Sequence, residues 1–287
     1  MDRLLSAVNV LLPLAYLAVW LDYRVIFQHE ARVAIRWSRR LALGTLALHT
    51  VAVVVRAVAW GRLPMATPLE FLSMLAFAVL AIYVVLEIRI GAPQTGFHVV
   101  GLAFAFQLLS SAFLSPETAD HALLQDPGFA LHAILVLLAY TALSLGFIYA
   151  LLYLLQARQL VRRTFGLLFQ RLPSLEILER MSVRSIQMGV PLLFGALVTG
   201  HWWTTALAGR LGPEAASRLS HFDPKVVVSW LFFLMYGVGL WGYERRGWRG
   251  RRMSILSVAL FVLMVLAVGI IRHFFRSFHN FNGGGAG

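Results

Sequence analysis

Long runs of apolar residues, separated by short polar segments, fill most of this chain. A run of about 18 or more residues with few charges is long enough to cross a hydrocarbon core about 30 Å thick. The sequence contains eight such runs, which leave little length for a separate soluble domain. The pattern predicts an all-α polytopic membrane protein of about eight transmembrane helices, with residues 1–287 as a single integral membrane domain. The helices are expected at about 4–23, 41–60, 69–88, 97–115, 129–156, 185–206, 225–243 and 253–276.

The two ends of the chain need separate treatment. Arg3 and the apolar stretch after it could pass for a signal peptide. No small-residue cleavage site follows, whereas a strongly basic segment does, so we interpret the stretch as the first transmembrane helix. Residues 283–287 are glycine-rich and are expected to form a flexible tail.

Basic residues are unequally divided between the two sides that alternate along the chain. Seventeen of the 25 Lys and Arg residues fall in the segments of one side and seven on the other, with Arg56 inside a helix. The more basic side is expected to be cytoplasmic. The segment 116–128 is acidic and has no Arg or Lys, as expected for the opposite side. Both termini are therefore predicted on the non-cytoplasmic side.

Composition narrows the possible functions. Hydrophobic residues make up 59% of the chain and charged residues 13%, about half the share in soluble domains. The net charge of +12 comes from arginines in short loops, in no nucleic-acid-binding motif, so no nucleic-acid partner is expected. There is no cysteine, which excludes disulfides, thiolate metal sites and thiol redox chemistry by this chain.

The connection 157–184 is the longest on the predicted cytoplasmic side. Its leucines alternate with arginines, which is typical of a short amphipathic helix on a membrane surface. A solvated connector fits the same composition.

The nine histidines are the main source of chemistry, because histidine can ligate haem iron without cysteine. Polar residues also collect at membrane interfaces for no functional reason. Most of these histidines fall at the non-cytoplasmic face, in helices that are distant in sequence: His121, His132, His201, His221, His273 and His279.

His49 lies deeper than the others. It stands about eight residues into the second predicted helix, or about 12 Å at 1.5 Å per residue, close to mid-membrane. An ionisable group there indicates a functional site, although a neutral histidine bonded to a neighbouring helix is the alternative. Arg56 follows two turns later on the same face. It could pair an acidic ligand group, reach outward to the interface or meet Glu70.

Residues at the non-cytoplasmic ends of two further helices add candidates. Asp223 and Lys225 flank a proline that starts the seventh predicted helix, which is ordinary helix punctuation. Trp202 and Trp203 lie where an aromatic belt is expected in any membrane protein. Their position beside His201 would also provide a flat apolar surface for a ligand.

Three stretches of the chain resemble the cytochrome c assembly family of membrane proteins, of the CcsA, CcmC and HemX type, and are most similar to the HemX branch. The resemblance covers about residues 41–281. Its parts are His49 to Arg56 with Gly61-Arg62-Leu63-Pro64 and Leu69-Glu70, then Leu131-His132 through Leu172-Pro173-Ser174-Leu175-Glu176, and finally Asp223-Pro224-Lys225 with Gly247-Trp248-Arg249-Gly250 and Phe278-His279.

The resemblance implies haem handling in a bacterial cytoplasmic membrane. His132 and His279 match the two histidines that family members place around an outer haem, and His49 matches an intramembrane one. Trp202 and Trp203 would then pack the macrocycle, with Arg56 or Lys225 near the propionates. The partners implied are membrane lipid, haem, and other cytochrome c biogenesis proteins or apocytochrome c.

The chain departs from the family pattern at two places. The loop of the form Trp-Gly-x-x-Trp-x-Trp-Asp is reduced to His201-Trp202-Trp203 and His221-Phe222-Asp223, and Trp241 stands where full synthases have a histidine. A HemX-like haem-binding or regulatory member is therefore favoured, closer to an assembly or regulatory factor than to a turnover enzyme. Two other functions stay open, a permease subunit for haem or another solute, and a haem-free regulatory or scaffold protein.

Overall fold

The computed structural model describes residues 2–29, 32–65, 67–113, 126–209 and 224–274, and within these ranges the chain forms helices and no strands. The helices are α1 (Asp2–His29), α2 (Arg32–Trp60), α3 (Pro68–Ile90), the short 3-10 helix η1 (Pro93–Thr95), α4 (Gly96–Phe113), α5 (Pro127–Arg162), α6 (Leu167–Arg171), α7 (Leu175–Ala208), α9 (Pro224–Arg245) and α10 (Arg251–Phe274).

The predicted all-α membrane fold is confirmed. Seven of the described helices, α1 to α5, α7 and α9, are long and apolar enough to cross a membrane. The 24-residue α10 stands where the eighth span was predicted. Each long helix includes all or nearly all of the run of residues from which it was predicted, because a chain in hydrocarbon must satisfy its backbone groups within the helix.

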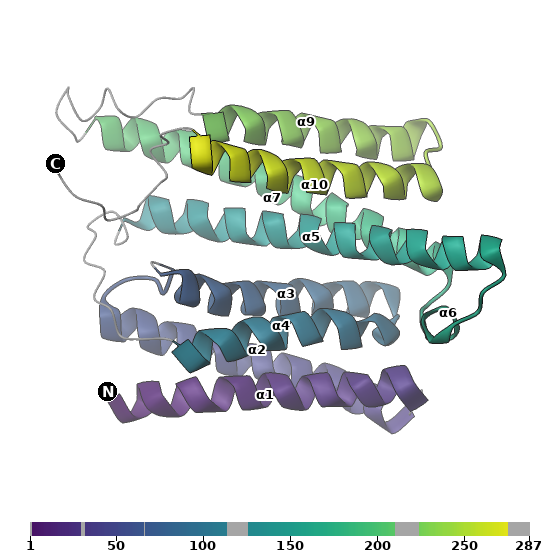
Figure 1. Ribbon diagram of the computed structural model, residues 1–287. Coiled ribbons are helices and arrows are strands. Elements are labelled where there is room, and N and C mark those ends of the chain that lie inside the picture. Colours follow the sequence, from purple (N-terminus) through teal and green to yellow (C-terminus); the bar gives the residue numbers. More distant parts are fainter. Residues whose placement is uncertain (1, 30–31, 66, 114–125, 210–223, 275–287) are drawn as a thin grey trace.

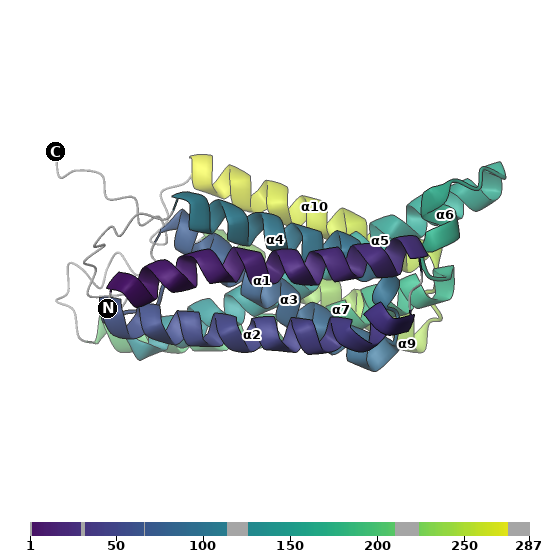
Figure 2. The same cartoon turned by 90° about the horizontal axis from the view of Figure 1, so that it is seen from below.

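The long helices run side by side in two layers. Figure 1 shows α1 to α4 in one layer and α5, α7, α9 and α10 in the other. Figure 2 shows the same bundle from the side of α1 and α2. We call the end at which α1, α3, α5 and α9 begin the Pro127 end, and the opposite one the Arg162 end. Because consecutive long helices are antiparallel, α10 finishes at the same end of the bundle as α1 begins, on the opposite side of it.

Local sequence fixes where two of these helices start. Thr67 is the N-cap of α3, and its side chain accepts a hydrogen bond from the Glu70 backbone N–H at 3.2 Å. Asp126 caps α5 in the same way, accepting from Gly128 N at 2.7 Å. A proline follows each cap at the first helical position, where its missing N–H costs nothing.

The prediction for 157–184 was wrong about the helix ends. Helix α5 continues to Arg162 and α7 already begins at Leu175, so most of this segment extends the two spans. Leucine, glutamine and arginine are good helix formers, and pairing between α5 and α7 favours continued helix. The five-residue α6 lies in the remaining connection and projects from the bundle (Figure 2).

The two layers are joined through α5 and α7. One apolar cluster fills α1 to α4 and reaches Tyr149 of α5, while a second lies among α5, α7, α9 and α10 around Phe232 and Tyr236. Helix α5 packs against α3, α7 and α10, which places it at the centre of the molecule. Helix α7 makes the most extensive contact with α5 and contains Pro191 in its interior.

Candidate functional site

His132 lies on the second turn of α5, near the Pro127 end. Its Nδ1 donates a hydrogen bond to the carbonyl oxygen of Ala196 on α7 at 2.8 Å. A carbonyl can only accept, so in the neutral ring the proton is on Nδ1 and Nε2 keeps its lone pair. This is the arrangement in which a histidine is oriented to ligate a metal through Nε2.

Gly200 on α7 makes room for this ring. A Cβ added at Gly200 would stand 2.8 Å from His132 Cε1 and 2.9 Å from Nδ1, closer than side chains tolerate. Ala196 and Gly200 are one turn apart on the same face of α7. One residue therefore orients the imidazole and the other gives it space.

A small cavity of about 160 Å³ borders His132 between α5, α7 and α9. Leu193 and Leu197 of α7 and Val226 of α9 line it together with Tyr140. This volume lies below the range of roughly 300–1,000 Å³ typical of small-molecule sites.

A larger cavity of about 500 Å³ lies further along α5, between α3, α9 and α10. Its wall is mostly apolar and includes Phe71, Phe261 and Met264. The two cavities share a boundary, so the space beside His132 adjoins a second apolar space that is lined by helices of both layers. The residues common to both are Val136, Tyr140 and Ser229.

The aromatic group at the end of α7 is divided between two environments. Trp203 is 3% exposed and packs against Phe129 of α5 with ring centroids 5.4 Å apart, whereas Trp202 is 63% exposed. Neighbours on a helix point about 100° apart, so the two indoles do not form one flat surface. Of the two predicted tryptophans, Trp203 is therefore part of the core and Trp202 lies on the outer surface of the bundle.

His201 is engaged by a residue that sequence reasoning did not select. The indole Nε1 of Trp230 on α9 donates to His201 Nε2 at 2.9 Å, and the two rings lie with centroids 6.0 Å apart. The nitrogen with the lone pair is therefore already used. In this arrangement His201 links α7 to α9.

His49 is fully buried in the α1 to α4 layer, and both of its ring nitrogens have partners. Nδ1 lies 3.0 Å from the Tyr16 hydroxyl of α1, and Nε2 lies 3.2 Å from Ser73 Oγ of α3. Ser73 itself donates to Gln107 Oε1 of α4 at 2.9 Å, so the proton between His49 and Ser73 belongs to Nε2. The Tyr16 hydroxyl then donates to Nδ1.

Arg56 extends the same network toward the Pro127 end. It is 2% exposed, donates to Ser73 Oγ at 3.1 Å and to Asn9 Oδ1 of α1 at 3.2 Å. Asn9 in turn donates to the Ser111 carbonyl oxygen of α4. Four helices are therefore joined by hydrogen bonds between side chains that would be costly to bury unpaired.

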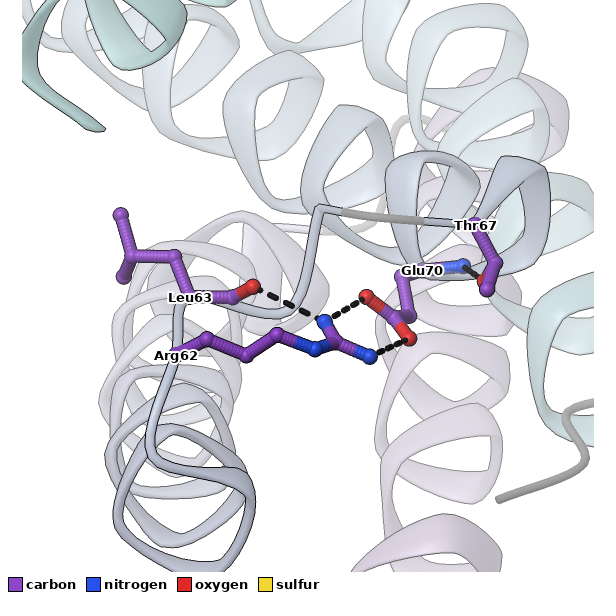
Figure 3. Close-up of polar contacts among 4 residues, drawn as sticks. All are labelled: Arg62, Leu63, Thr67 and Glu70. Carbon is purple, nitrogen blue, oxygen red and sulfur yellow. Dashed lines mark hydrogen bonds and ion pairs between the residues drawn. The ribbon is translucent and has the colours of Figure 1, made fainter. Parts of the chain in front are cut away.

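Glu70 pairs with Arg62 rather than with Arg56. Two parallel hydrogen bonds of 2.7 and 2.9 Å join the guanidinium to the carboxylate, and both side chains are under 10% exposed (Figure 3). Arg62 also donates to the Leu63 carbonyl oxygen at 3.1 Å, while Thr67 caps α3 beside it. This buried ion pair closes the turn between α2 and α3.

A second buried carboxylate lies toward the Arg162 end of the same layer. Tyr23 of α1 donates a hydrogen bond to Glu87 of α3, and Glu87 is 4% exposed. Tyr83 stands edge-on to Tyr23 with centroids 5.5 Å apart. Gly96 leaves no room for a side chain beside these rings.

Several predicted site residues are not placed. His279 and Asp223 lie outside the described residues, and Lys225 is the second residue of α9, without a described side chain. The predicted His132 and His279 pair is therefore a matter for experiment. Within the described ranges, no three His, Asp or Glu side chains come close enough to hold a metal ion among themselves.

The polar partners of His49 and Arg56 were missed from the sequence. A signal did exist on α1, where Asn9, Tyr16 and Tyr23 follow one another at intervals of seven residues and so share one face. Ser73 and Gln107 carry no such pattern. Their role depends on which helices meet, which spacing along one helix does not reveal.

Comparison with known proteins identifies relatives over most of the chain. The sequence model of a family described as "Cytochrome C assembly protein" matches residues 46–279. Protein HemX of Brevibacillus brevis is 29% identical over 279 residues, covering 91% of this chain and 97% of the relative. Inner membrane protein YpjD of Escherichia coli (strain K12) is 30% identical over 181 residues, 62% of this chain and 64% of the relative. Cytochrome c biogenesis protein CcsA of Prochlorococcus marinus is 23% identical over 252 residues, 78% and 77% of the two chains.

Proposed function

Because this chain belongs to the cytochrome c assembly protein family, we propose that it binds haem at the Pro127 end of the bundle and serves cytochrome c maturation or the control of haem supply. Its multi-pass membrane fold and its similarity to HemX and CcsA proteins support this proposal. The role fits an assembly or regulatory factor, which positions a cofactor rather than turning over a substrate.

The observation that carries the proposal is the state of His132. Its Nδ1–H is held by Ala196, its Nε2 lone pair is unprotonated, and a cavity borders the ring. Haem iron takes its axial ligands from such imidazole nitrogens. Tyr140 and the apolar side chains between α3, α5, α9 and α10 would contact the macrocycle and exclude water.

The second ligand is assigned by resemblance. His279 would supply it, and Lys225 would supply positive charge for the propionates. His49 fits this role less well, because an iron bond would require its Nε2 to leave Ser73 or its Nδ1 to leave Tyr16. We therefore assign His132 and His279 to the iron and give His49 a separate test in the Discussion.

An optical spectrum tests the proposal directly. Purified protein, recorded with and without reductant, is expected to show low-spin haem bands characteristic of two histidine ligands. His132→Gly and His279→Gly should each convert the spectrum to a five-coordinate or haem-free form that added imidazole restores. His29→Gly is the matched control, since His29 is exposed at the Arg162 end. Wild-type bands in both glycine variants would contradict the assignment, and the absence of haem in wild-type protein would favour a scaffold or permease.

The orientation of the protein belongs to the same proposal. We place the Pro127 end on the non-cytoplasmic side of the membrane and the arginine-rich Arg162 end on the cytoplasmic side, in accordance with the positive-inside rule. The chain has no cysteine, so Ala119→Cys and Val161→Cys each introduce a unique thiol. An impermeant thiol reagent applied to intact cells should label Ala119→Cys alone. Labelling of Val161→Cys alone would invert the topology.

The partner follows from the proposed site. A CcsA relative carries the name cytochrome c biogenesis protein, and a haem at the outer face would be accessible to apocytochrome c or to another biogenesis protein there. Cross-linking from Trp202, which is 63% exposed at this face, would identify such a partner. Cross-links to lipid alone would favour a role in haem supply.

A further inference from the structure

A cleft of about 640 Å³ lies at the Arg162 end, between the last turns of α5 and the first turns of α10. It lies at the opposite end of the bundle from His132 and shares no lining residue with the two cavities described above. Its lining consists of Leu154, Ala157, Arg158, Val161, Arg162, Arg251 and Ile255.

The cleft gathers three positive charges without a negative one. Arg158 and Arg162 stand one turn apart on α5, where like charges repel each other, and Arg251 at the start of α10 adds a third. No Asp or Glu lines the cleft. Across the ranges that the structure describes, these three guanidinium groups have no side-chain hydrogen bond or ion pair.

Three other arginines at the same end do have partners. Arg180 pairs with Glu176 at 2.7 Å, Arg184 bonds to Gln187 at 3.0 Å, and Arg249 donates to the Tyr243 carbonyl oxygen at 2.7 Å. These side chains are occupied by their own neighbours. The three arginines of the cleft instead leave their donors available to a ligand.

The remaining lining residues are apolar. Leu154 and Val161 of α5 and Ile255 of α10 form a wall beside the guanidinium groups. Helix α5 runs past the start of α10 at this end (Figure 1). The cleft therefore combines apolar side chains with the guanidinium groups of the last turns of α5. A ligand that fits must have an anionic head and an apolar body.

We infer that this cleft is a binding site for an anionic phospholipid, with the phosphate held by Arg158, Arg162 and Arg251 and an acyl chain along the α5 and α10 wall. Arginine matches phosphate oxygens with paired N–H donors. The apolar wall favours a lipid over free phosphate, which would gain nothing from it. The lipid bridges two helices and relieves the repulsion between Arg158 and Arg162.

The test compares lipid retention by purified protein after extensive washing in neutral detergent. The protein is loaded with phosphatidylglycerol or phosphatidylcholine, and bound lipid is counted by native mass spectrometry. Wild-type protein should retain phosphatidylglycerol selectively. A basic residue near an anionic surface contributes about 1 kcal/mol, so each of Arg158→Gln, Arg162→Gln and Arg251→Gln should weaken phosphatidylglycerol binding about fivefold.

A matched control removes the same charge at the same end. The triple variant Arg180→Gln, Arg184→Gln, Arg249→Gln should retain phosphatidylglycerol within about twofold of wild type, whereas the triple variant of the cleft should lose selectivity for it. Size-exclusion profiles establish that both triples are folded, and the single Arg251→Gln variant replaces the cleft triple if that protein aggregates.

Three outcomes would overturn the inference. Equal retention by wild type and cleft variants would show that the cleft holds no lipid. Equal losses in the cleft and control triples would show a diffuse charge effect. Displacement of phosphatidylglycerol by inorganic phosphate, without any effect of acyl-chain length on retention, would identify an anion site that does not recognise lipid.

Discussion

The layer of α1 to α4 and the layer of α5, α7, α9 and α10 bury polar groups in opposite ways. In the first, His49 and Arg56 of α2 each bond to side chains of α1 and to Ser73 of α3, which in turn bonds to α4. In the second, His132 uses one ring nitrogen to fix its orientation and leaves the other beside a cavity. Both histidines stand within transmembrane helices, yet only one has an available ligand atom.

An ionisable residue inside a membrane can therefore be structural. Burial of Arg56 and His49 is tolerated because both ring nitrogens of His49 and both terminal nitrogens of Arg56 have hydrogen-bond partners. Removing one partner leaves another polar group unpaired in a low-dielectric interior. A ligand site needs an unused atom and space beside it. Four sets of substitutions test this contrast between the layers.

The largest loss of stability is expected on breaking the Arg62 and Glu70 ion pair. Removing one partner of a buried pair costs about 3–5 kcal/mol, because the other charge stays buried. Glu70→Gln and Arg62→Ala should each lower the unfolding temperature in detergent strongly. The exposed pair Arg180 and Glu176 is the control, and breaking it should change the free energy of unfolding by less than about 1 kcal/mol. Comparable losses for both pairs would contradict a structural role specific to the buried one.

His49→Leu should lower the free energy of unfolding by about 1–3 kcal/mol, because the Tyr16 hydroxyl and Ser73 lose a buried partner. The optical spectrum of haem bound at His132 should be unchanged. His29→Leu, at an exposed position, should affect neither property. Loss of a haem band in His49→Leu would instead give His49 an iron-ligand role and erase the contrast between the layers.

Gly200→Ala should act on the second layer alone. The added methyl group would push the His132 ring from its place and destabilise the protein by about 1–3 kcal/mol, the usual cost of overpacking. Haem retention should fall several-fold and be restored in part by imidazole. Gly44→Ala on α2 meets no atom within 4 Å and should be neutral or slightly stabilising. Normal haem retention in Gly200→Ala would show that His132 does not hold the iron.

The two helix caps give the smallest effect. Thr67→Ala and Asp126→Ala should each cost about 1 kcal/mol of stability, since each removes an N-cap followed by proline. Only Asp126→Ala loosens the first turns of α5, which carry His132. A weakened haem spectrum is therefore expected in Asp126→Ala and not in Thr67→Ala. Equal haem spectra in the two variants would show that the Asp126 cap does not affect the proposed haem site.

The sequence sufficed to locate the transmembrane helices, because hydrocarbon imposes length and composition on each one separately. It was less informative about the connection 157–184. Arginine and leucine there fit a surface segment, but contact between α5 and α7 extends both spans. The hydropathy of one segment does not show which helix packs against it. It therefore does not predict that packing between α5 and α7 continues both helices beyond their apolar residues.

The candidate site was predictable in part. The depth of His49 and the position of His132 near the start of α5 follow from the sequence. The choice of Arg62 over Arg56 as the partner of Glu70 does not, because it depends on the turn between α2 and α3. The engagement of His201 by Trp230 likewise arises only when α7 meets α9.

Pro191 gives the two central helices different mechanical properties. A proline within a helix removes one backbone hydrogen bond and creates a place where the helix bends, and α5 has no proline after its first residue. Helix α5 is therefore uninterrupted over about 54 Å, at 1.5 Å per residue, whereas α7 beside it lacks one backbone hydrogen bond at Pro191. Ala196 and Gly200, which orient and accommodate His132, both lie after Pro191 in α7. A bend of α7 at Pro191 would change the orientation of the His132 imidazole without moving α5.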